Sequence, residues 1–187
     1  MGLRISPTTT KRSIRAITLD LDDTLWPCEP TLLRAERLTL DWLTERVPGV
    51  IAPWSIERLR ERRMAIHADH PELKRDFVAI RRRALQEVFR EAGADEVQCA
   101  SIIEGSLDVY MTARHQVTLY PEVLASLERL SAQYRIASLS NGNACLVQIR
   151  LDHLFHARIA AHILDDFVGI TALKLRIFVV DACKRPL

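Results

Sequence analysis

The sequence predicts an α/β fold in which a parallel sheet is interrupted by a bundle of helices. An apolar run at 14–19, typical of a buried strand, ends in the acidic segment 20–25. Four segments with apolar residues at helical spacing then occupy 31–113. A further helix and an apolar strand follow at 121–139, which gives the β-α-β rhythm of a parallel sheet.

Proline and a serine N-cap mark where the helices of the insert begin. The first helix is predicted to follow Pro30, a favoured first-turn residue, and the second to begin near Ser55. Four amphipathic helices in succession favour a small helical bundle. We therefore expect a four-helix domain at 29–113, inserted into a sheet domain built from 1–28 and 114–187.

After the insert, Pro121 opens a helix, and the strand at 135–139 is closed by the turn Ser140-Asn141-Gly142. The carboxyl ends of parallel strands meet at one edge of a sheet, where ligands bind. The acidic segment and this turn are therefore expected to lie together. The Ser140 hydroxyl and the N–H groups of the turn could hold a phosphate oxygen, although an ordinary turn has the same composition.

Asp20 and Asp22 stand two residues apart at the point where the first strand ends. Two unpaired carboxylates there would repel each other and resist desolvation, so they make a poor structural core. They suit a divalent cation and a phosphate, with one carboxylate attacking phosphorus while the other handles the proton. The alternative is a strand-to-turn junction that is rich in aspartate.

Composition limits the other possibilities. The net charge of the 187 residues is +2, and no apolar stretch approaches the length needed to span a bilayer. The polar, basic N-terminus lacks the apolar region of a secretory signal, and the four cysteines form no C-x-x-C pair, so we expect a cytoplasmic protein with reduced cysteines. Arg81, Arg82 and Arg83 could contact nucleic acid, but interleaved acids favour solvated helix faces instead.

The motifs resemble those of the haloacid dehalogenase superfamily of phosphatases. The segment 20–25 (DLDDTL) resembles the first motif of that family, and 136–142 (IASLSNG) resembles the second. The helical insert lies where the family has a helical cap over a Rossmann-like core. Three shorter segments are similar to a subgroup that dephosphorylates flavin mononucleotide and the phosphorylated pyrimidine precursor of riboflavin: 25–26, 32–37 and 141–144.

The resemblance implies roles for individual residues. Asp20 would be the nucleophile that forms an aspartyl-phosphate, and Asp22 would be the general acid and later the base. Thr24 would steady the loop, while Ser140 and Asn141 would hold the phosphoryl group. The implied cofactor is Mg2+, bridging Asp20, the backbone carbonyl of Asp22 and an acid from a later motif. The implied substrate is a small phosphorylated metabolite, such as a flavin or a riboflavin precursor.

The C-terminal segment departs from the family pattern, and two alignments are open. In the first, 169–178 occupies the third motif, Ala172 replaces the expected lysine and Lys174 is out of register. In the second, 162–166 (HILDD) resembles the fourth motif, and Asp165 would be the metal-ligating acid. We favour the second alignment because it keeps an acid pair.

The sequence therefore predicts a magnesium-dependent phosphomonoester hydrolase. Because the lysine of the third motif is missing or displaced, one alternative is a shortened relative that binds phosphate or metal and turns over little. Another is a helical module that uses its arginines to bind a partner or RNA. The sequence predicts no oligomeric state.

Overall fold

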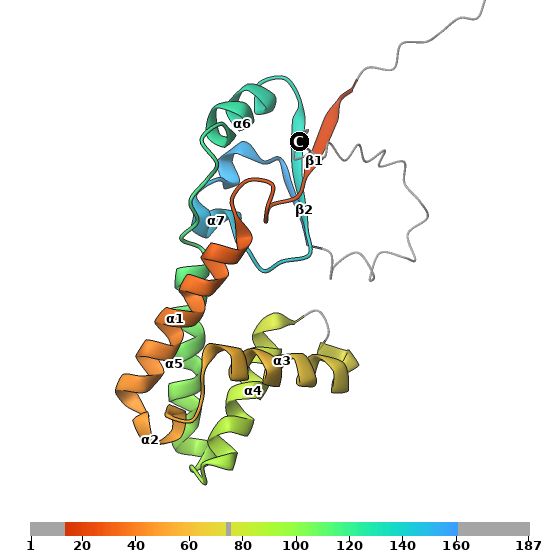
Figure 1. Cartoon of the computed structure of the whole chain (residues 1–187). Helices are drawn as coiled ribbons and strands as arrows, with labels where there is room; N and C mark the ends of the chain where they lie inside the picture. The colour runs from red at the N-terminus through yellow and green to blue at the C-terminus, as the bar shows by residue number, and fades with distance from the viewer. Residues whose placement is uncertain (1–13, 74–75, 161–187) are drawn as a thin grey trace, which may run out of the picture.

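The computed structural model describes residues 14–73 and 76–160, and within these ranges the chain forms a parallel sheet with helices around it (Figure 1). The strands are β1 (Ala16–Leu19), β2 (Arg135–Ser140) and β3 (Ala157–Ala160), in the order β1-β2-β3. Ile17 is opposite Ile136, and both neighbouring pairs of strands are parallel. The predicted α/β fold with a parallel sheet is confirmed.

The sheet has an apolar core that also anchors the acidic segment. Ile17 of β1 and Ile136 of β2 are buried, and α6 (Val123–Ser131) packs on them through Val123 and Leu127. Three apolar residues that follow β1 belong to the same cluster: Leu21, Leu25 and Trp26. The loop that carries the aspartates is therefore fixed to the core by its own apolar side chains.

The helices between β1 and α6 form the inserted bundle. Their bounds are α1 (Cys28–Arg46), α2 (Pro48–Ile51), α3 (Ile56–Asp69), the 3-10 turn η1 (Pro71–Leu73), α4 (Phe77–Glu91) and α5 (Glu96–Arg114). The four long helices match the predicted ones, and Ser55 caps α3 by accepting a hydrogen bond from the Arg58 N–H. The exact domain limits given above stay a prediction.

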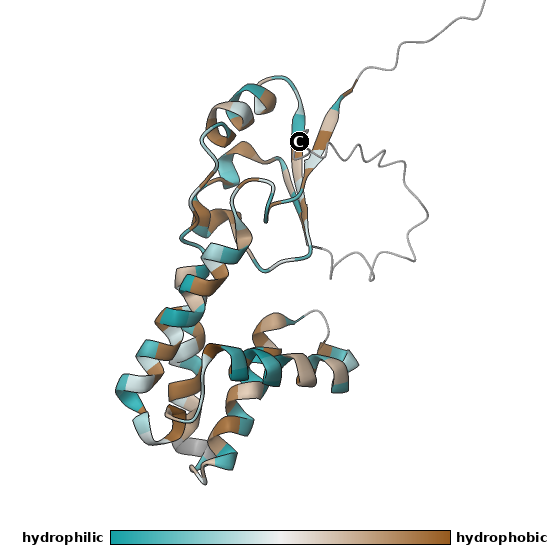
Figure 2. Cartoon of the chain, viewed as in Figure 1, coloured by the Kyte–Doolittle hydropathy of each residue, from teal (hydrophilic) through white to brown (hydrophobic). Residues whose placement is uncertain are grey.

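The insert has its own apolar core, distinct from that of the sheet. Buried residues of α1 to α5 form it, including Leu43, Val88 and Leu107, and Figure 2 shows hydrophobic and hydrophilic residues alternating along these helices. The helices α1 and α5, which enter and leave the insert, pack along each other and lead back to the sheet (Figure 1). Ala35, Tyr110 and Ala113 form a small cluster between them. None of the helices in the described ranges combines the length and apolar character that crossing a bilayer requires.

After β2 the chain forms short elements before it reaches β3. These are α7 (Leu146–Ile149) and the 3-10 turn η2 (Asp152–Leu154). Leu146, Leu151 and Leu154 are buried against the sheet core. The short elements are therefore held by packing, since four-residue helices have little stability of their own.

Candidate active site

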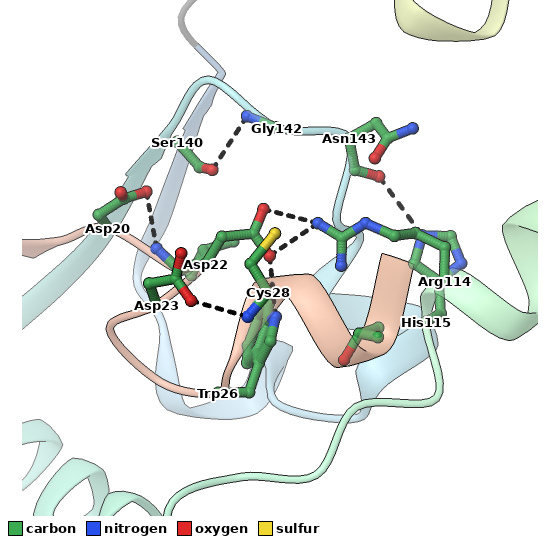
Figure 3. Close-up of polar contacts among 12 residues, drawn as sticks. Asp20, Asp22, Asp23, Trp26, Cys28, Arg114, His115, Ser140, Gly142 and Asn143 are labelled. Atoms are coloured by element: carbon green, nitrogen blue, oxygen red, sulfur yellow. Dashed lines mark hydrogen bonds and ion pairs between the residues drawn. The ribbon is translucent and has the colours of Figure 1, made fainter. Parts of the chain in front are cut away.

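The acidic loop makes a tight reversal directly after β1. The Leu25 N–H donates to the Leu21 carbonyl at 2.8 Å, and the Asp23 N–H donates to the Trp26 carbonyl at 2.8 Å. Asp23 has a φ of 57°, a left-handed conformation that aspartate tolerates better than most side chains. The reversal brings the carboxyl end of β1 next to the start of α1, so that three aspartates and the helix N-terminus share one small region (Figure 3).

The outer two aspartates of this loop have different partners. Asp20 is exposed, and its Oδ1 accepts a hydrogen bond from the Leu21 N–H at 2.8 Å. Asp23 Oδ1 accepts from the Cys28 N–H at 2.8 Å, so its side chain satisfies the first turn of α1. This contact explains why α1 begins at Cys28, before the predicted start after Pro30. Both carboxylates are exposed to solvent, and that of Asp23 also acts as a cap for α1.

Asp22 is held by two side chains that only donate hydrogen bonds. Trp26 Nε1 donates to Asp22 Oδ1 at 2.8 Å, and Arg114 Nη2 lies 2.7 Å from Oδ1 and 2.6 Å from Oδ2 (Figure 3). Trp26 is fully buried and Arg114 is 1% exposed. The carboxylate is thus fixed in orientation by one residue of its own loop and by the last residue of α5.

Arg114 is a site residue that the sequence reasoning missed. It lies four residues after Tyr110 and seven after Leu107, both buried, so it falls on the apolar face of α5. A charged residue at an apolar helical position is the signal that could have identified it. Among the described residues, Arg114 is the charged side chain that forms an ion pair with an aspartate of the acidic loop.

The turn after β2 lies directly against Asp22. Ser140 is buried, and its Oγ accepts a hydrogen bond from the Gly142 N–H at 3.2 Å. A Cβ added to Gly142 would lie 2.7 Å from Asp22 Oδ2 and 3.5 Å from Ser140 Oγ. The two strand ends therefore meet as the sequence predicts, and only glycine leaves room for the Asp22 carboxylate in this position.

The remaining predicted residues are less engaged. Thr24 is half-buried, and its backbone N–H donates to the Leu21 carbonyl at 3.2 Å. Asn141 is exposed at the tip of the turn. Asp165 and Lys174 lie outside the described residues. Within 14–73 and 76–160 no three His, Cys, Asp or Glu side chains gather closely enough to hold a metal, so a complete ion site there would need further ligands.

Two titratable groups near the Arg114–Asp22 pair, Cys28 and His115, have pKa values shifted in favour of their neutral forms. Burial, followed by the negative charge of Asp22, raises the pKa of the Cys28 thiol to about 11. The thiol therefore stays protonated and is not a nucleophile. Burial lowers the pKa of His115, and the positive charge of Arg114 acts in the same direction, while a hydrogen bond from Nε2 to the Asn143 carbonyl at 3.4 Å opposes it.

A cavity of about 350 Å³ lies beside the end of α5. Its lining comes from α5, α7 and the linker after α5: Asp108, Met111, Thr112, His115, Gln116 and Gln148. It does not include Asp20, Asp22 or Ser140. The predicted catalytic residues therefore lie at the edge of the sheet and not in this cavity.

Comparisons with known proteins agree with the architecture. A family model for haloacid dehalogenase-like hydrolases matches residues 14–180. The 5-amino-6-(5-phospho-D-ribitylamino)uracil phosphatase YigB of Escherichia coli (strain K12) is 26% identical over 131 residues, which are 70% of this chain and 55% of YigB. This chain thus spans about half the length of that relative.

A solved structure gives the same picture. The crystal structure of a 2-haloacid dehalogenase from Pseudomonas syringae pv. Tomato DC3000 matches with a TM-score of 0.74 and 34% identity, over 81% of this chain and 66% of that one. A putative HAD-hydrolase, YfnB from Bacillus subtilis, solved bound to magnesium, matches with a TM-score of 0.48 and 15% identity, over 81% and 66% of the two chains.

Proposed function

This chain belongs to the haloacid dehalogenase-like hydrolases, and from that membership we propose that it hydrolyses a small phosphomonoester through an aspartyl-phosphate on Asp20. The observation that carries the proposal is the contrast between the two carboxylates. Asp20 is exposed at the strand end, while Asp22, two residues on, is fixed beside it by Arg114 and Trp26. One carboxylate is accessible for attack, and the other is oriented for proton transfer.

In the first proposed step, a carboxylate oxygen of Asp20 attacks phosphorus and the bond from phosphorus to the ester oxygen breaks. Asp22, protonated at that stage, gives its proton to the departing oxygen, which leaves as an alcohol. In the second step a water attacks the phosphorus of the aspartyl-phosphate, and Asp22 takes a proton from it. Inorganic phosphate leaves, and Asp20 returns as a carboxylate.

Residues at the two strand ends would position the phosphoryl group. The buried Ser140 hydroxyl and the N–H groups of the turn at 140–142 lie next to Asp22, and Asn141 is exposed at the same turn. Thr24 would support the loop between the two carboxylates. Phosphoryl transfer depends mostly on positioning and charge neutralisation, which a rigid pair of loops can supply.

Mg2+ is the cofactor we propose, because the donors present are of the right type. Asp20 offers an exposed carboxylate, and oxygen ligands are those that Mg2+ prefers. The Asp22 carboxylate is occupied by Arg114 and Trp26, which fits a role in which its backbone carbonyl would meet the ion. Asp165 is the proposed third ligand. When bound, the ion would neutralise charge on the phosphoryl oxygens.

For the substrate we propose a phosphorylated flavin or riboflavin precursor. The support is the similarity to the E. coli phosphatase, whose name gives a phosphorylated ribitylamino-uracil as its substrate. The subgroup-like segments at 25–26, 32–37 and 141–144 support the same class.

A second candidate is dehalogenation of a small 2-halo acid, favoured by the 34% identity to the P. syringae dehalogenase. Asp20 would then attack the carbon that carries the halogen, halide would leave, and water would hydrolyse the resulting ester. A halide ion leaves without a proton, whereas an alkoxide needs one. A fixed second carboxylate therefore has a use in phosphoester hydrolysis that it lacks in this first step, and for this reason we favour the phosphatase.

The deciding experiment assays the full chain for phosphate release from p-nitrophenyl phosphate and a panel of phosphate esters, and for halide release from 2-chloropropionate. We expect phosphate release that needs Mg2+ and disappears in Asp20→Asn. The matched control is Asp23→Asn, because asparagine can also cap a helix and adopt the left-handed conformation. Halide release instead would establish the second candidate, and neither activity would establish a shortened relative without turnover.

A further inference from the structure

We infer that Arg114 is a positioning residue for Asp22, through which the end of α5 holds the general acid in its working orientation. This inference rests on the proposed phosphatase function and adds a residue to it. Arg114 Nη2 contacts both oxygens of Asp22, at 2.7 and 2.6 Å, across 92 positions of sequence. The carboxylate therefore depends on a residue of the helical insert for its orientation.

The contact fixes the carboxylate in two ways. Trp26 Nε1 and Arg114 Nη2 both donate to Oδ1, and Arg114 Nη2 also donates to Oδ2. Gly142 closes the other side, because a Cβ there would lie 2.7 Å from Oδ2. An aspartate with no such partners could take several rotamers, and proton transfer requires the oxygen within hydrogen-bond reach of the leaving group.

The burial of Arg114 argues against a purely structural role. Its side chain is 1% exposed, yet Nε and Nη1 have no hydrogen-bond partner in the described part of the chain. Burying a guanidinium whose donors are only partly satisfied is costly, and an apolar residue would often stabilise such a position better. The charge is thus explained by what it does to Asp22.

The end of α5 contacts both loops of the proposed site. Beside the Arg114–Asp22 pair, Asn143 of the second loop donates to Met111 Sδ at 3.6 Å and accepts from His115. Arg34 of α1 donates to the carbonyls of Ala113 and Gln116, on either side of Arg114. The helix end is therefore fastened to α1, and a shift of the insert would move the cation that orients Asp22.

The test compares Arg114→Gln and Arg114→Lys with a control, Arg82→Gln, whose arginine pairs with Glu104 in the insert. Two substrates separate the roles: p-nitrophenyl phosphate, whose nitrophenolate leaves without a proton, and β-glycerophosphate, whose alkoxide needs one. We expect Arg114→Gln to lower kcat about 100-fold on β-glycerophosphate and less than about tenfold on p-nitrophenyl phosphate, with KM nearly unchanged. Arg114→Lys should recover part of the loss, and Arg82→Gln should match the parent chain.

Equal losses on both substrates, or none, would overturn the inference while leaving the phosphatase proposal intact. A readout that needs no turnover is the indole N–H resonance of Trp26 in 15N-labelled protein, identified by comparison with Trp42→Phe and Trp54→Phe. If Arg114 holds Asp22, this resonance shifts in Arg114→Gln in the direction seen for Asp22→Asn. An unmoved resonance contradicts the inference. If the parent chain releases no phosphate, the proposed function fails, and the resonance still decides whether Arg114 sets the position of Asp22.

Discussion

The helical insert and the edge of the sheet use charge in opposite ways. In the insert, arginines and glutamates of different helices share ion pairs, as where Glu36 accepts hydrogen bonds from both Arg63 and Arg81. At the sheet edge three aspartates of one loop stand against one contacting cation, Arg114, among the described residues. The loop at the sheet edge therefore carries an excess of negative charge that a divalent cation would neutralise, whereas the Glu36 cluster has two arginines for one carboxylate.

This difference separates charged side chains that stabilise the fold from those that act in the proposed reaction. The paired residues of the insert come from different helices: Glu36 from α1, Arg63 from α3 and Arg81 from α4, with Arg81 also lying over the Tyr110 ring of α5 at 3.5 Å. Such a cluster ties the bundle together. The arginines of the 81–83 run are each paired with a glutamate, so their charges are already engaged within the insert.

The largest effect is expected from Glu36→Gln. This change leaves Arg63 and Arg81, which are 15% and 12% exposed, without their shared carboxylate. We expect a loss of about 3 kcal/mol in the free energy of unfolding, because removing one partner of a buried pair leaves an uncompensated charge. Urea unfolding measures the loss, and activity per folded molecule should stay near that of the parent chain.

The matched control for this cluster is Arg63→Met. Burial, followed by the positive charge of Arg81, lowers the pKa of Arg63 to about 10, because these two arginines repel each other. Removing one of them leaves a one-to-one pair, and the loss should be clearly smaller than for Glu36→Gln. Equal losses would mean that packing, rather than charge, accounts for the cluster.

The second largest effect is expected for Gly142→Ala, which should lower activity. The added methyl group would lie 2.7 Å from Asp22 Oδ2, so the carboxylate must turn away from Arg114. We expect turnover of β-glycerophosphate to fall about 100-fold, since an ångström of misplacement in a catalytic group is costly. The melting temperature should also fall, because the buried Arg114 guanidinium would lose its carboxylate partner. A stable variant with full activity would show that the position of Asp22 does not limit the reaction.

A much smaller effect is expected for the surface pair of Arg82 and Glu104. Their side chains are 38% and 55% exposed, although the Arg82 Nε lies only 2.6 Å from Glu104 Oε1. We expect Glu104→Gln to cost less than about 1 kcal/mol, because solvent and salt screen exposed pairs. Unfolding in 0.05 and 1 M NaCl would measure it: the difference between parent and variant should shrink at high salt. A loss as large as that of Glu36→Gln would remove the distinction between partly buried and exposed pairs.

The sequence predicted the parts of the fold that depend on local pattern. The parallel strands and the four long helices followed from apolar periodicity, and the family resemblance followed from 20–25 and 136–142. The roles of the three aspartates were harder to separate, because Asp23 differs from Asp20 only through its contact with the Cys28 N–H. Arg114 escaped prediction because its partner is 92 residues away, and burial of a charge is decided by tertiary packing.

The smallest effect concerns His115, which links the two regions at the end of α5. Burial lowers its pKa in the folded chain below the ordinary value near 6.5, whereas the unfolded chain keeps that value. Below pH 6.5 the imidazole therefore binds a proton more readily in the unfolded state than in the folded state, so the free energy of unfolding falls as the pH is lowered. Above that range this group does not affect stability. The imidazole is half-exposed, so solvent reduces the effect to about 0.5 kcal/mol or less between pH 7.5 and 5.5.

Urea unfolding of the parent chain and of His115→Gln at both pH values would measure it, and the variant should lose less stability on acidification. Identical pH dependence in the two proteins would mean that His115 titrates alike in the folded and unfolded states, and that the junction between insert and sheet is more open to water than its contacts with Asn143 indicate.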